Sequence, residues 1–152
     1  MRSKYFTALL FATVLFAAPA CADTTPHTED VVIKTSSGPV TFHAEIADTQ
    51  ASQETGLMFR TSMDADHGML FELSHEPAVI QFWMKNTLIP LDMVFIGQKG
   101  DVVGIVKNAV PKSLTPVGPD APVTAVLEIN GGVADKLGIK TGDKVVHPFF
   151  QP

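Results

Sequence analysis

Three charged or amide side chains interrupt an apolar stretch in the middle of the chain. The stretch QFWMKNTLIPLDMVFI, residues 81–96, contains Lys85, Asn86 and Asp92. Further along, Glu128 stands between apolar neighbours in AVLEIN. A buried carboxylate without a partner is costly, so each carboxylate needs a cation, several hydrogen-bond donors or a raised pKa. These side chains are therefore the first candidates for binding or catalysis.

Two interpretations of these groups are open. In the structural one, a basic side chain, Arg60 or Lys85, forms an ion pair with one of the two carboxylates and holds a loop against a sheet. In the functional one, the charges converge beside Trp83, Met58 and Met84 in a pocket for a small molecule or peptide. The candidate binding residues are Arg60, Trp83, Lys85, Asn86, Asp92 and Glu128.

An enzymatic interpretation uses Asp92 and Glu128 as an acid/base pair. Two carboxylates in unlike environments can divide those roles, as in a hydrolase that acts on glycans. However, the nucleophile, zinc-protease and phosphate-loop motifs GxSxG, HExxH and GxxxxGK are absent from the sequence. The sequence therefore favours a non-enzymatic binding or accessory module, and the hydrolase is the alternative.

Copper binding by methionine is a second alternative, because thioethers are good ligands for Cu(I). Methionine also fills irregular apolar cores, and this packing role is the favoured interpretation. No metal or cofactor is predicted on this basis. The methionines concerned are Met58, Met63, Met69, Met84 and Met93.

Residues 1–22 have the three-part pattern of a secretory signal peptide. Arg2 and Lys4 precede an apolar run over 5–18, and small residues lead to a cleavage site after Ala22. The run is shorter than the roughly 20 apolar residues that span a bilayer, and no later segment is long and apolar enough. We expect an exported protein, periplasmic or secreted. Alternatively, Cys21 carries a lipid anchor.

Charge and cysteine content exclude further classes. Arg2 and Lys4 are two of the 11 basic residues, so the cleaved chain has 9 basic against 16 acidic residues, a net charge of −7. Such a surface repels nucleic acid. Cys21 is the only cysteine, so a chain cleaved after Ala22 has neither disulfides nor a catalytic thiol. The expected partner is a small ligand or an envelope protein.

The elements that must position the candidate residues are short strands joined by turns. Two hairpins are predicted, around the turns at 36–39 and 97–100. Two short helices are predicted, one capped by Asp48 and ended by Gly56, the other ended by Gly138. The predicted strands cover residues 31–35, 39–47, 69–73, 79–86, 91–96, 101–110, 123–129 and 144–150.

These elements predict a mainly β fold. About eight short strands with two short helices are typical of a single compact β-sandwich, jelly-roll-like, or of a partly closed barrel. The signal peptide (1–22) and a polar leader (23–30) precede one domain, 31–152. The proline-rich segment 111–122 is expected to form a rigid connection, and such loops also often border sites.

Five motifs follow one another in the domain: GLMFR at 56–60, GMLFEL at 68–73, FWMKNTLIPLDMVFI at 82–96, LEINGG at 127–132 and GDKV at 142–145. With these motifs the chain resembles the domain-of-unknown-function 192 (DUF192) family over roughly Val32 to Phe149. The resemblance implies a mainly β, sandwich-like fold and often an export signal. It brings no established activity, cofactor or catalytic residue. The matched polar positions are Arg60, Lys85, Asn86, Thr87, Asp92 and Glu128.

Overall fold

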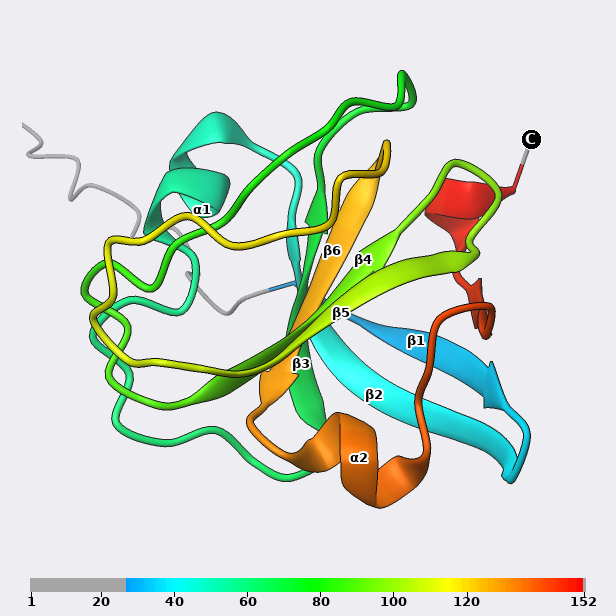
Figure 1. The fold of residues 1–152 in the computed structure, drawn as a ribbon, viewed down its shortest axis with the longest axis horizontal. Coiled ribbons are helices and arrows are strands. Elements are labelled where there is room, and N and C mark those ends of the chain that lie inside the picture. Colours follow the sequence, from blue (N-terminus) through cyan, green and yellow to red (C-terminus); the bar gives the residue numbers. More distant parts are fainter. Residues whose placement is uncertain (1–26, 152) are drawn as a thin grey trace, which may run out of the picture.

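The computed structural model describes residues 27–151, so the signal-peptide and Cys21 predictions lie outside the described residues. Within them, seven strands form one curled sheet, accompanied by two α-helices and one 3-10 turn (Figure 1). The fold is therefore mainly β, as predicted. The elements are β1 Thr28–Thr35, β2 Gly38–Ala47, α1 Gln50–Thr55, β3 His67–Glu72, β4 Leu91–Ile96, β5 Val102–Ala109, β6 Ala125–Asn130, α2 Val133–Leu137, β7 Lys144–Val146 and the 3-10 turn Pro148–Phe150.

The strand order is β5-β4-β6-β3-β2-β1-β7. All neighbouring strands are antiparallel except β2 and β3, and both predicted hairpins, β1–β2 and β4–β5, are present. The two edge strands approach each other. Asp101, next to β5, forms a bridge with Lys144 of β7, and the Val145 N–H donates to the Gly100 carbonyl at 2.7 Å. The observed form is thus the partly closed barrel.

The inside of the curled sheet is one apolar core. Every strand contributes to it, for example through Ile33, Phe42 and Leu127, each fully buried. The helix α2 lies across one end of this core (Figure 1) and adds Ala134. Strand residues of this core alternate with outward-pointing ones, as the two-residue period of a strand requires.

A second apolar core lies on the outer face of β3, β4 and β6. In β4, Val94 and Ile96 point inward, whereas Leu91, Met93 and Phe95 belong to this outer core. The outer core is covered by the irregular segments that follow α1 and precede β4. Because both of its faces are covered, all six residues of β4 are buried. Burial on two faces explains why this stretch is nearly continuously apolar.

The segment 79–86 is not a strand, contrary to the sequence prediction. It lies over the outer core, outside the sheet, and makes only isolated contacts with the proline-rich segment 111–122. Phe82 exchanges two backbone hydrogen bonds with Val117 at 2.8 Å, and the Met84 N–H donates to the Ser113 carbonyl at 3.0 Å. Proline lacks an N–H, so segment 111–122 cannot continue a ladder. Segment 111–122 therefore holds residues 82–84 in place through these few hydrogen bonds without forming a sheet with them.

The other boundary differences are smaller. The N-cap of α1 is Thr49 rather than Asp48, because the Thr49 hydroxyl accepts the Ser52 N–H in a capping box. Gly56 and Gly138 end the two helices, as predicted. The last strand stops at Val146, and a 3-10 turn with a proline at its start follows at Pro148–Phe150. Across the described part of the chain, no helix has the length and apolarity needed to cross a membrane.

Candidate functional site

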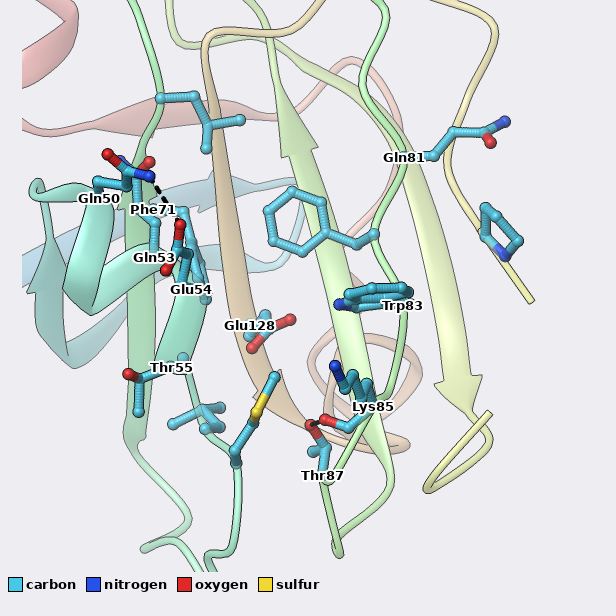
Figure 2. Close-up of a pocket in the computed structure, with 16 residues that line it drawn as sticks. Gln50, Gln53, Glu54, Thr55, Phe71, Gln81, Trp83, Lys85, Thr87 and Glu128 are labelled. Carbon is cyan, nitrogen blue, oxygen red and sulfur yellow. Dashed lines mark hydrogen bonds between the residues drawn. The ribbon is translucent and has the colours of Figure 1, made fainter. Parts of the chain in front are cut away.

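A pocket of about 450 Å³ opens on the outer face of the sheet, between α1 and the segment 81–87 (Figure 2). Apolar atoms make up most of its lining surface, as in small-molecule sites, and half of its lining residues carry polar or charged side chains. It is lined by Gln50, Gln53, Glu54, Thr55, Gly56, Leu57, Met58, Phe71, Leu73, Gln81, Phe82, Trp83, Lys85, Thr87, Pro116 and Glu128.

Glu128 lies at the floor of this pocket. Its strand, β6, is central in the sheet, and the residues opposite Glu128 are Met69 of β3 and Met93 of β4. The outward-facing side chains of these three strands belong to the outer core, so apolar side chains surround the glutamate. Only 5% of its surface is exposed. Its carboxyl group faces the pocket (Figure 2).

The Glu128 carboxyl has no hydrogen-bond or ion-pair partner among residues 27–151. Burial alone acts on it and raises the pKa of the group to about 8. At pH 7 the free protein therefore holds this carboxyl mainly in its neutral form. A buried, unpaired and strongly perturbed group inside a cleft is a candidate functional residue on physical grounds.

One wall of the pocket is the extended segment that carries Trp83. Side chains alternate here as in a strand: Met84 is buried in the outer core, whereas Trp83 and Lys85 point to the other side. Trp83 is 51% exposed, and the Lys85 ammonium lies 5.3 Å from the centre of its ring. This is the distance of a cation–π contact. Sequence alternation correctly placed these two side chains together.

The opposite wall is α1, which sequence reasoning did not include. Positions 50, 53 and 54 share one face of a helix because of its 3.6-residue period. Gln53 is fixed by two hydrogen bonds from its amide, to the Ala47 carbonyl at 3.1 Å and the Glu72 carbonyl at 2.8 Å. Gln50 donates to Glu54 at 2.8 Å. The i, i+3, i+4 spacing of these three polar residues is the sequence pattern that could have indicated a shared polar face on this helix.

Asp92 does not belong to the pocket. It pairs with Ile129 in the sheet and points to the inner face, whereas Glu128 points to the outer face. Its oxygens accept the backbone N–H groups of Asn108 at 2.7 Å, Gly132 at 3.0 Å and Ala134 at 2.8 Å. Asp92 thus joins a bulge of β5 to the start of α2. The acid/base pair of the alternative hydrolase hypothesis is therefore separated by the sheet.

Neither Arg60 nor Lys85 forms an ion pair with Asp92 or Glu128. The ion pairs predicted by the structural interpretation of the sequence are therefore wrong. Arg60 forms a two-pronged ion pair with Glu45 of β2, in which its second nitrogen lies 2.7 Å from the carboxylate. Asn86 occupies a turn with φ of 56° and donates to the Met58 sulfur at 3.7 Å. Both residues therefore hold loops beside the pocket.

Four of the five methionines in the alternative copper hypothesis are packing residues in this structure. Met69, Met84 and Met93 are buried in the outer core, and Met63 packs against it. The fifth, Met58, lines the pocket. No group of three or more His, Cys, Asp or Glu side chains among the described residues is arranged to hold a metal ion.

A second ionisable cluster, unexpected from the sequence, ties the two ends of the domain together. His147 is buried, with Nε2 3.0 Å from Glu29 of β1 and Nδ1 3.5 Å from Glu72 of β3. Burial raises the pKa of Glu72, while hydrogen bonding to His27 lowers that of Glu29. Contacts over such sequence separations leave no local pattern. This cluster serves the fold rather than the pocket.

Residues 31–147 match the model of the DUF192 family, which is described as "Uncharacterized ACR". The chain belongs to this family. The match includes every pocket residue and both carboxylates, Asp92 and Glu128. Among curated proteins, none matches the chain.

Two solved structures are similar to the chain. A protein of unknown function from Novosphingobium aromaticivorans is 46% identical with a TM-score of 0.77, over 87% of this chain and 94% of its own. A "putative transcription regulator" from Sinorhizobium meliloti is 39% identical, also with a TM-score of 0.77, over 82% of this chain and 97% of its own. Both span nearly the whole domain, and neither name states a ligand.

Proposed function

We propose that this protein is a non-enzymatic small-ligand-binding module of the cell envelope, with the Glu128 pocket as its site. The observation that carries the proposal is the carboxyl group of Glu128, a residue that is only 5% exposed, because this group has no partner in the described chain. A group of this kind lowers stability, and proteins retain such groups where they serve a function.

The shape and lining of the pocket support a small ligand. Its volume of about 450 Å³ lies in the range of roughly 300–1,000 Å³ that ligand sites occupy. Trp83 offers a half-exposed aromatic wall, and Phe82 packs edge-on against Phe71 with ring centres 5.1 Å apart. The Gln53 amide is held by two hydrogen bonds, so this wall is ordered before a ligand arrives. A preformed site loses less entropy on binding.

Binding is favoured over hydrolysis by the separation of the two carboxylates. A two-carboxylate mechanism needs both groups in one site, where they flank the scissile bond of the same substrate. Asp92 lies on the inner face of the sheet and is occupied by backbone donors, so only Glu128 can reach a pocket ligand. The envelope location rests on the sequence of residues 1–22.

The name of the Sinorhizobium relative suggests transcription regulation as another function. DNA binding depends on a basic surface that neutralises phosphates. The chain instead carries a net charge of −5. A DNA-binding role would also leave the buried Glu128 carboxyl unexplained. We therefore place small-ligand binding first.

The single tryptophan makes the proposal directly testable, because Trp83 lies in the pocket. Its fluorescence should change when amines, sugars, amides or carboxylates from a small-metabolite panel bind, and the same compounds should raise Tm. Glu128→Gln should weaken binding, whereas Glu76→Gln, the same change at an exposed site outside the pocket, should not. Equal binding by Glu128→Gln and wild type would refute the assignment of the site.

A further inference from the structure

We infer that the pocket binds a small organic cation, with an ammonium group against Glu128 and an apolar body against Trp83 and Phe82. This inference rests on the proposed function and names its ligand class. Glu128 is more than nine-tenths buried, and its carboxyl group faces the pocket and lacks a partner in residues 27–151. A cationic ligand supplies the missing counter-charge.

The charges around the pocket favour a cation. Apart from Glu128, the ionisable residues that line it are Glu54 of α1 and Lys85 of the opposite wall. The neighbouring strands present uncharged methionines, Met69 and Met93, opposite Glu128. Lys85 is exposed and makes no ion pair with Glu128. With Glu128 ionised, the lining has two negative groups and one positive group.

The aromatic wall favours a cation for an independent reason. The faces of aromatic rings are negative and attract ammonium groups. The Lys85 ammonium already lies 5.3 Å from the centre of the Trp83 ring. This wall therefore holds an ammonium group in the free protein. A ligand cation that enters beside Trp83 competes with Lys85 for the ring and also gains the contact with Glu128.

The pH dependence of binding distinguishes a cation from a neutral ligand. Because burial raises the pKa of Glu128 to about 8, the carboxyl must lose its proton to pair with a cation at pH 7. Affinity for a cation should then rise by about tenfold per pH unit from pH 6 to near pH 8. A neutral hydroxyl ligand uses the protonated carboxyl, so its affinity should fall above pH 8.

Three compounds of similar shape test the ligand class: phenethylammonium, 2-phenylethanol and phenylacetate. Trp83 fluorescence and calorimetry should show the tightest binding for the ammonium compound, which stays protonated over this range. Calorimetry in buffers of different ionisation heat should show proton release at pH 7. Glu128→Gln should weaken ammonium binding by more than tenfold and change alcohol binding by less than about twofold.

Two further variants complete the test. Lys85→Met should strengthen ammonium binding, because it removes the competing cation from Trp83. Glu76→Gln, outside the pocket, should leave it unchanged. If the alcohol or phenylacetate binds as tightly as the ammonium compound, or if only uncharged or anionic panel compounds bind, the cation inference is wrong and the proposed function stands. If neither these compounds nor the panel binds, both are wrong.

Discussion

Asp92 and Glu128 are carboxylates buried in neighbouring strands, β4 and β6, yet the hydrogen-bond partners of their oxygen atoms differ. Asp92 accepts three backbone N–H groups at 2.7–3.0 Å. The Glu128 carboxyl is surrounded by apolar side chains and faces an open pocket, and it has no partner in residues 27–151. Both residues look alike in the sequence, each between apolar neighbours.

This difference separates a structural carboxylate from a functional one. The Asp92 oxygens satisfy donors that would otherwise be buried without an acceptor, so the side chain stabilises the fold. The Glu128 carboxyl satisfies nothing in the free protein, so its burial lowers the free energy of unfolding at neutral pH. Burial of a charged residue is therefore a weak guide to its role. The number of its hydrogen-bond partners is a better one.

Asp92→Ala should have the largest effect. It leaves three buried backbone donors without an acceptor and should reduce the free energy of unfolding by about 3–5 kcal/mol. Urea unfolding measures this loss. Asp92→Asn keeps one acceptor oxygen and should lose about half as much. A loss below about 1 kcal/mol for Asp92→Ala would place the stabilising contacts elsewhere.

Glu128→Gln should act in the opposite direction. Burial raises the pKa of this group from 4.5 to about 8. Between these values the unfolded chain ionises and the folded chain does not, so wild-type stability falls by about 1.4 kcal/mol per pH unit. Glutamine removes this loss, and the variant should be about 3 kcal/mol more stable at pH 7. Near pH 4 the two proteins should unfold at similar urea concentrations.

Gly68→Ala should disturb the floor of the pocket without touching either carboxyl group. An added Cβ at position 68 would lie 2.7 Å from the Glu128 carbonyl oxygen, a backbone atom that cannot turn aside. We expect a loss of about 2 kcal/mol in urea unfolding, typical of overpacking. Gly97→Ala is the matched control, because its Cβ would meet only the movable Val103 side chain closely, at 3.2 Å. An equal loss in both variants would contradict the prediction.

Arg60→Met should have the smallest effect. Arg60 and Glu45 form a partly exposed ion pair, with side chains 34% and 18% exposed, so solvent screens it. Its removal should reduce stability by about 1 kcal/mol. A double-mutant cycle with Glu45→Gln isolates the pair. A loss as large as that of Asp92→Ala would mean that Arg60 supports a buried carboxylate after all.

Much of the fold could be predicted from local patterns. The two hairpins follow from β-branched alternation around glycine-containing turns, and Gly56 and Gly138 end the helices as their positions predict. The segment 79–86 could not be recognised as irregular, because its residues alternate as a strand does. Whether alternating residues join a sheet depends on distant partners, and here the partner segment contains prolines.

The candidate site could be predicted only in part. Trp83, Lys85 and Glu128 were expected together and do line one pocket. Alternation also places Asp92 and Glu128 on definite faces of their own strands. It does not say which face of one strand matches which face of the other, since that depends on register. For the same reason, Glu45 could not be identified as the partner of Arg60.

The most direct test of the central claim is a carbon NMR titration of the Glu128 carboxyl in glutamate-labelled protein, assigned by comparison with Glu128→Gln. If the group is buried without a partner, its pKa should be about 8. Addition of phenethylammonium should lower that pKa, because a cation stabilises the ionised form. A pKa at or below the ordinary value of 4.5 in the free protein would contradict the claim, since it would require a donor or cation already paired with Glu128.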